Sequence, residues 1–202
     1  VDALVLMDAL SDEQVCAIPL DEPFRRRFGN PYAVVHRADL HGVLVDACRA
    51  HAGVTLRTGA RVSGYAQDGS GITAILAQGE ALKGMALIGA DGLHSAIRAQ
   101  LVGDGAPVVS GHTTFRSVIA TELMPEALRW NGATLWAGPK CHIVHYPLQG
   151  WKVFNLVATV QNNATEAVAG EPVPTELVHQ SFAHLAPRAQ SLIHAAGSWK
   201  RW

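Results

Sequence analysis

Four stretches in the second half of the chain alternate apolar and polar residues with the two-residue period of a β-strand. They read TTFRSVIA from Thr113, ATLWAG from Ala133, CHIVHYPL from Cys141 and KVFNLVATVQ from Lys152. Alternation over consecutive segments is typical of an antiparallel sheet with one face in the core and the other open. The second half of the chain is therefore expected to form a mainly antiparallel β-sheet.

Composition excludes several classes of function. A formal net charge of -1 over 202 residues leaves no basic stripe of the kind that binds nucleic acid. No apolar run reaches the roughly 18 residues that a bilayer span requires. Three cysteines without CxxC spacing indicate a reducing, cytoplasmic setting, and ten histidines without an HExxH motif give no reason to expect a metal.

The rest of the chain mixes helix and strand. Residues 3–7 and 14–18 are expected to form strands, residues 37–52 a mostly helical segment, and residues 54–90 a series of short strands. The last of these is expected to be a buried strand that ends in Gly89 to Gly92. Two short helices, broken near Pro187, are expected close to the carboxyl end.

The stretch LIGADGLHSAIR, from Leu87 to Arg98, combines an acid, a glycine and a basic residue in a compact pattern. With Asp91 at a strand end, Gly92 permits a sharp turn into a helix, and Ser95 and Arg98 fall along one face of that helix. This arrangement suits a cofactor at the carboxyl edge of a sheet. It also suits a simple helix cap at Asp91 with Arg98 extending into solvent.

This stretch resembles the G-A-D-G-x-x-S-x-x-R signature of the flavin-dependent aromatic hydroxylases, and VVHRADLHGVL resembles their H-R-x-x-L segment. The chain looks most like the branch acting on 3-hydroxybenzoate, salicylate and 6-hydroxynicotinate, with 3-hydroxybenzoate ranked first. The resemblance implies FAD as cofactor and NADH or NADPH as co-substrate. It implies that Arg37 contacts FAD, that Asp91, with Gly92 and Ser95, binds its ribose or pyrophosphate region, and that Arg98 assists nicotinamide-cofactor binding.

The implied fold is α/β (α+β). A partial Rossmann-like FAD-binding domain with a β meander is expected at residues 31–103, and a mainly antiparallel substrate-binding domain at residues 104–202, to which residues 1–30 contribute a strand pair. The chain lacks the family's G-x-G-x-x-G and its later Gly-Asp motif, because Gly103-Asp104 follows the DG helix too closely. The chain is therefore expected to be a central portion of the enzyme, inactive alone.

Residues for the substrate come from the strand CHIVHYPL. Its alternation places His142 and Tyr146 on one face and His145 on the other. The resemblance implies that His142 takes up or relays the proton of a substrate phenol, so that the phenolate attacks an electrophilic flavin hydroperoxide, and that Tyr146 positions the ring. The alternative is that both are ordinary strand residues bonded to backbone. Arg116 is a candidate partner for a substrate carboxylate or for an acid across the sheet.

The resemblance thus implies a monooxygenase that adds one atom of O2 to a small hydroxybenzoate-type acid, and a homodimer is the family's expected assembly. Two alternatives stay open. One is a non-catalytic folding or dimerisation module, and the other is a flavin reductase or epoxidase that shares the GADG signature.

Overall fold

The computed structural model describes residues 1–202, which form two compact units. The larger unit combines Val1–Gly42 with Val109–Trp202, and the smaller unit is Val43–Val108. The division falls inside helix α2 (Arg37–Ala50), which covers most of the helical segment expected there. The domain boundaries expected at residues 31 and 104 stay a prediction.

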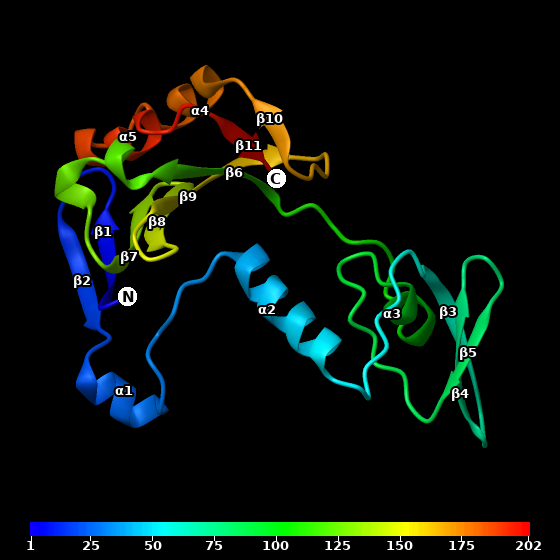
Figure 1. The fold of residues 1–202 in the computed structure, drawn as a ribbon. Helices are drawn as coiled ribbons and strands as arrows, with labels where there is room; N and C mark the ends of the chain where they lie inside the picture. Colours follow the sequence, from blue (N-terminus) through cyan, green and yellow to red (C-terminus); the bar gives the residue numbers. More distant parts are fainter. The chain divides into compact units, whose positions relative to one another are not determined.

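The larger unit is built on an eight-stranded sheet with the order β10-β11-β6-β9-β8-β7-β1-β2 (Figure 1). Every neighbouring pair is antiparallel except β1 and β7, which run parallel. The expectation of a large, mostly antiparallel sheet is confirmed. The strands are β1 (Ala3–Asp8), β2 (Gln14–Pro19), β6 (Gly111–Ala120), β7 (Gly132–Gly138), β8 (Cys141–Leu148), β9 (Val153–Ala164), β10 (Glu171–Val173) and β11 (Trp199–Arg201).

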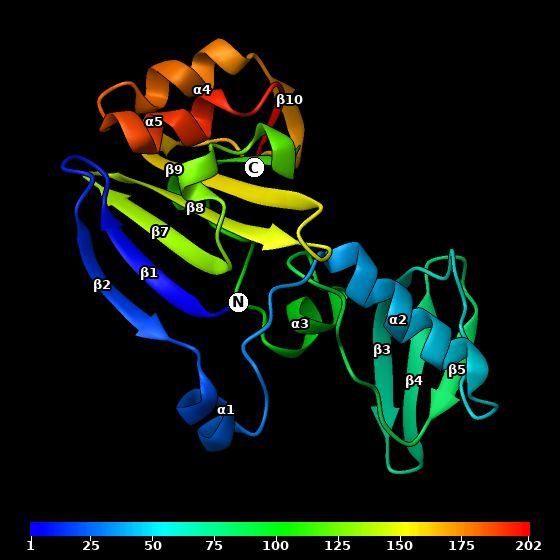
Figure 2. The same ribbon diagram turned by 60° about the vertical axis from the view of Figure 1, so that its left-hand side comes forward.

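One face of this sheet is covered by α4 (Thr175–Phe182) and α5 (Pro187–His194), as Figure 2 shows. The two helices separate at Pro187, where the fixed φ of proline suits the first turn of a new helix. Phe115, Phe154 and Phe182 are almost fully buried between sheet and helices. The alternate side chains of β6, β8 and β9 therefore form an open face on the other side of the sheet.

Three further short helices belong to the larger unit. They are α1 (Glu22–Phe28) and the 3-10 turns η1 (Thr121–Leu123) and η2 (Glu126–Leu128), whose Leu128 is buried in the core. Gly29 ends α1 with a left-handed φ of 73°, a conformation that glycine adopts without steric cost. None of the helices has the length and apolar character needed to cross a bilayer.

The smaller unit is an antiparallel meander of β3 (Val62–Asp68), β4 (Gly71–Leu76) and β5 (Ala81–Gly84), with the short helix α3 (Ala96–Leu101). A tight turn at residues 69 and 70 connects β3 and β4. Gln100 links α3 to β3, because its side chain accepts from the Tyr65 N–H at 2.8 Å and donates to the Tyr65 carbonyl at 2.6 Å.

The buried strand expected to end in Gly89 to Gly92 is not formed. Residues 85–90 have no regular structure, and Met85 and Ile88 are 99% and 89% exposed. A strand forms only where a neighbour takes up its backbone hydrogen bonds. No segment of this chain pairs with residues 85–90, so Asp91 follows a loop rather than a strand.

Candidate functional site

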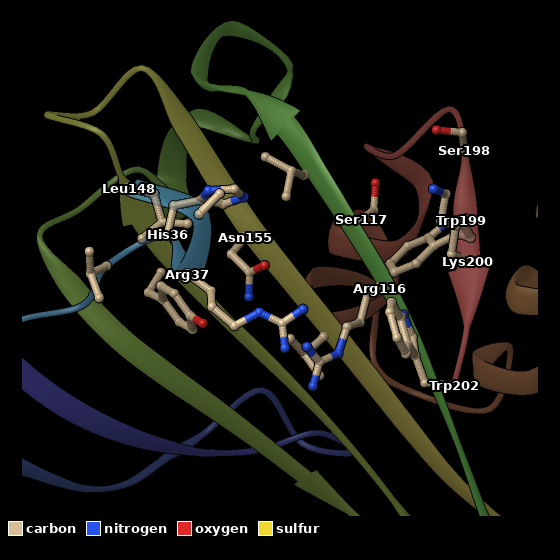
Figure 3. Close-up of a pocket in the computed structure, with 15 residues that line it drawn as sticks. His36, Arg37, Arg116, Ser117, Leu148, Asn155, Ser198, Trp199, Lys200 and Trp202 are labelled. Carbon is tan, nitrogen blue, oxygen red and sulfur yellow. The ribbon is translucent and has the colours of Figure 1, made fainter. Parts of the chain in front are cut away.

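A cleft of about 540 Å³ lies on the open face of the large sheet, where β6, β8, β9 and β11 meet the start of α2 (Figure 3). Both polar and apolar side chains line it. The polar and charged lining residues are His36, Arg37, Arg116, Ser117, Tyr146, Asn155, Ser198 and Lys200.

The strand register sets these side chains in rows across the sheet. Tyr146 on β8 stands opposite Asn155 on β9. In the next row, Val144, Val157, Arg116 and Lys200 follow one another from β8 to β11. Successive rows on one face are about 7 Å apart, which is two strand residues. The apolar side chain of Val157 therefore has the polar row of Tyr146 and Asn155 beside it, and its own row ends with two cations.

His142 lies one row further on, opposite Thr159, and does not line the cleft. Four strand residues separate it from Tyr146, a distance of about 13 Å along β8. The two side chains share the open face, as the alternation predicts, but do not meet at one point. Only a ligand lying between them would contact both.

The pKa shifts of His142 and Tyr146 both favour the neutral form of the side chain. Burial lowers the pKa of His142, and the nearby charge of His112 lowers it further. Burial raises the pKa of Tyr146, which Arg116 opposes and Tyr32 reinforces. At neutral pH His142 is therefore a proton acceptor, and the Tyr146 hydroxyl is a hydrogen-bond donor.

Positive charge dominates the cleft. Arg37, Arg116 and Lys200 line it, no acidic side chain does, and none of the three takes part in an ion pair. Figure 3 shows the guanidinium groups of Arg37 and Arg116 reaching toward the middle of the cleft. The Arg116 guanidinium lies 5.7 Å from the centre of the Trp202 ring. Arg116 therefore has no acid partner across the sheet and is available to an anion.

Sequence reasoning did not identify Asn155 or Lys200. Asn155 belongs to a strand whose alternation was visible, so its open face was predictable from NLVATV. Lys200 lies in β11, a three-residue strand that is too short to show a period. Only its pairing with β6 places Lys200 beside Arg116.

The DG segment belongs to the smaller unit, and its contacts are local. Asp91 accepts hydrogen bonds from the Ser95 hydroxyl and, at 3.3 Å, from the Ile97 N–H. Ser95 caps α3 by accepting from the Arg98 N–H at 2.9 Å. The bond from Ser95 is the main cause of the lowered pKa of Asp91, with the Ile97 N–H adding to it. Ser95 rather than Asp91 is therefore the N-cap of α3, and the roles of Asp91, Gly92 and Ser95 toward a cofactor stay predictions.

Arg98 does not extend freely into solvent. Its guanidinium forms an ion pair with Asp104 through Nε and Nη2, and the same pairing raises the pKa of Arg98. Gly92 has a φ of 79°, and no atom lies within 4 Å of the position of a Cβ. The exposed Asp91 carboxylate can therefore accept a further hydrogen bond from an approaching hydroxyl.

These two surfaces, each taken by itself, suit FAD. The cleft offers cations to an anionic cofactor, and the DG segment offers an open backbone turn with a free acceptor for a ribose hydroxyl. No group of three or more side chains of metal-ligating type comes together in the structure.

Comparison with known proteins decides the family. The sequence model that defines the FAD binding domain family matches residues 18–173. The chain belongs to the FAD binding domain family. The resemblance drawn from the two motifs is thereby confirmed, and FAD is the cofactor of this family.

Curated relatives extend over the whole chain. It is 52% identical over 202 residues to "3-hydroxybenzoate 6-hydroxylase 1" of Aquipseudomonas alcaligenes, a match that covers 100% of the chain and 51% of that protein. It is 42% identical over 201 residues to "3-hydroxybenzoate 6-hydroxylase" of Polaromonas naphthalenivorans (strain CJ2), covering 100% and 50%. The chain thus spans about half the length of these relatives.

The fold also matches that of solved structures. A salicylate hydroxylase in a substrate complex superposes with a TM-score of 0.82 at 21% sequence identity, covering 100% of this chain and 52% of that one. At this identity the likeness shows the fold alone. The α/β class expected from the sequence is confirmed by it.

Proposed function

We propose that this chain is the central portion of an FAD-dependent monooxygenase that hydroxylates 3-hydroxybenzoate, with NADH or NADPH and O2 as co-substrates. The observation that carries the proposal is the cation-lined cleft on the open face of the sheet, in a chain 52% identical to a 3-hydroxybenzoate 6-hydroxylase. A small aromatic acid matches the apolar floor and the positive end of the cleft.

The residues of the chain have distinct tasks in this proposal. The ring lies over Val157, and Arg116 binds the carboxylate at the end of the row. His142, neutral at pH 7, accepts the proton of the phenol, which makes the ring more electron-rich. Tyr146 donates a hydrogen bond that positions the substrate. FAD, when bound, supplies electron transfer and the activation of oxygen.

Cofactor binding is assigned as the family resemblance implies. Arg37 contacts FAD from the cleft, and Asp91 binds the ribose or pyrophosphate region with Gly92 and Ser95. Arg98 assists binding of the nicotinamide cofactor. For this, the Arg98 guanidinium must either leave Asp104 or contact Asp104 and the cofactor together. The 202 residues lack a G-x-G-x-x-G turn, so we propose that alone they bind FAD weakly and do not hydroxylate. A cytoplasmic homodimer is part of the same proposal.

The test is oxygen incorporation by the intact gene product loaded with FAD. With 3-hydroxybenzoate, NADH or NADPH, and ¹⁸O2, we expect 2,5-dihydroxybenzoate that carries one ¹⁸O atom, detected by mass spectrometry. A product without label, or no product, rejects the proposal. Consumption of reduced nicotinamide with hydrogen transfer to the substrate instead favours a reductase, and a colourless protein that binds no FAD favours the non-catalytic module.

The role of His142 is tested by H142Q. Loss of the proton acceptor should lower kcat by about 10² to 10⁴-fold, the usual contribution of general acid–base catalysis. The loss should shrink as pH rises toward the pKa of the free phenol, because hydroxide then removes the proton. H51Q, which lies just after α2 in the smaller unit, serves as the matched control and should keep wild-type activity. A deficit in H142Q that does not change with pH would assign His142 a structural role.

A further inference from the structure

Arg116 and Lys200 stand directly opposite each other on the antiparallel strands β6 and β11. Like charges in directly opposed positions of a sheet destabilise it. The structure shows no local compensation, since neither residue forms an ion pair and no acid lines the cleft that both border. The two cations therefore lack an anionic partner in the structure.

The geometry suits a carboxylate in particular. The Arg116 guanidinium lies over the Trp202 ring, 5.7 Å from its centre, a contact that favours one orientation of the guanidinium. Lys200 is exposed, and its flexible stem brings an ammonium to the same side of the sheet. A carboxylate has two oxygens, so one can accept from the guanidinium while the other accepts from the mobile ammonium.

We propose that Lys200 is a specificity-determining residue that binds the carboxylate of the aromatic acid together with Arg116. The identity of the ligand rests on the proposed function. The presence of the anion site rests on the strand register and on the unpaired cations. Lys200 thereby selects benzoates over phenols and neutral aromatic compounds of the same size.

The test compares benzoate with benzamide, a neutral analogue of the same shape. Binding of each is measured by titration calorimetry to the FAD-loaded intact gene product, for wild type, K200M and K200R. K200M keeps the length of the side chain and removes its charge. K83M, on exposed β5 of the smaller unit, is the matched control.

We expect K200M to bind benzoate about tenfold more weakly, the equivalent of one charge-assisted hydrogen bond. Benzamide binding should change less than about twofold, K200R should restore benzoate affinity, and K83M should match wild type. Unchanged benzoate affinity in K200M overturns the proposal, as does an equal loss for benzamide or an absence of benzoate binding to wild type. A loss of FAD affinity with benzoate binding intact also overturns it, because Lys200 would then serve the cofactor phosphates.

Failure of this inference is distinguishable from failure of the proposed function. A protein that binds benzoate through Lys200 and incorporates no oxygen refutes the hydroxylase proposal only. A protein that hydroxylates 3-hydroxybenzoate with the same KM in wild type and K200M refutes the Lys200 proposal only. Thermal unfolding of each variant shows whether the fold is retained, and K200R repeats the test where K200M unfolds.

Discussion

Two histidines three residues apart on β8 have opposite environments because a strand turns alternate side chains to opposite faces. His142 reaches the open face, whereas His145 is fully buried and stacks on Trp136. The Trp136 indole donates to His145 Nδ1 at 3.3 Å. This sorting was predictable from the letters CHIVHYPL, but the indole partner was not, because the pairing of β7 with β8 brings it there.

Burial of His145 makes the stability of the larger unit dependent on pH. Its pKa falls to about 4 in the folded chain, against 6.5 for an ordinary histidine. As pH drops below 6.5 the unfolded chain takes up a proton first, so stability is present above that pH and is lost toward pH 4. The loss reaches about 3 kcal/mol for this residue.

Urea unfolding at pH 7.0 and pH 4.5 measures this loss. H145N keeps a hydrogen-bond acceptor for Trp136 and cannot be protonated, so its free energy of unfolding should vary less with pH than that of wild type. H41Q, which replaces an exposed histidine on α2, should keep the wild-type dependence. Identical pH dependence in H145N and wild type would contradict the assignment.

Elements differ in how far the sequence determines them. Strands β6 to β9 were predictable because their alternation is strong and their neighbours are close in the chain. The apolar run before Asp91 did not become a strand, because its hydrogen-bonding partner would have to come from elsewhere. Apolar composition alone therefore gave the wrong element for residues 85–90. The DG segment is attached to its unit through α3 instead.

The attachment of α3 depends on Gln100, which satisfies both backbone groups of Tyr65. Q100L removes both hydrogen bonds and should raise the amide exchange rate of Tyr65 about tenfold or more, since each bond contributes about 1 kcal/mol. Q100E keeps the acceptor and loses the donor, so its exchange rate should be intermediate. Hydrogen exchange followed by NMR gives both rates, and an unchanged rate in Q100L would show that other contacts hold α3.

At the scale of the whole molecule, the order of strands in the sheet departs from their order in the chain. The sequence predicted that the first two strands join the sheet formed by the second half of the chain, but not that β1 lies parallel to β7 with β2 at the edge. Parallel pairing across more than a hundred residues leaves no local signal. The sequence could show only that β1 is apolar, so that one of its faces must be buried.

This topology predicts that residues 21–202 do not fold cooperatively. Strand β1 contributes Val5 and Met7 to the core of the larger unit, and Ala9 directly after it is fully buried. Burial of a valine or methionine side chain stabilises by about 1.5–3 kcal/mol each, and a domain is stable by only about 5–15 kcal/mol. The truncation removes these side chains, the hydrogen bonds to β7 and the residues that pack on Trp136. It therefore removes most of the free energy of unfolding.

Near-ultraviolet circular dichroism during heating distinguishes the outcomes, because Trp136 packs in this core. The 21–202 chain should lose the tryptophan signal and the sharp transition, and M7A should retain the transition at a lower midpoint, for a cost of about 2–5 kcal/mol. V15T, on the exposed face of edge strand β2, should shift stability by less than about 0.5 kcal/mol. A truncated chain that unfolds sharply at the wild-type midpoint would mean that β1 belongs to the sheet without stabilising it. The core would then have to be complete in residues 109–202.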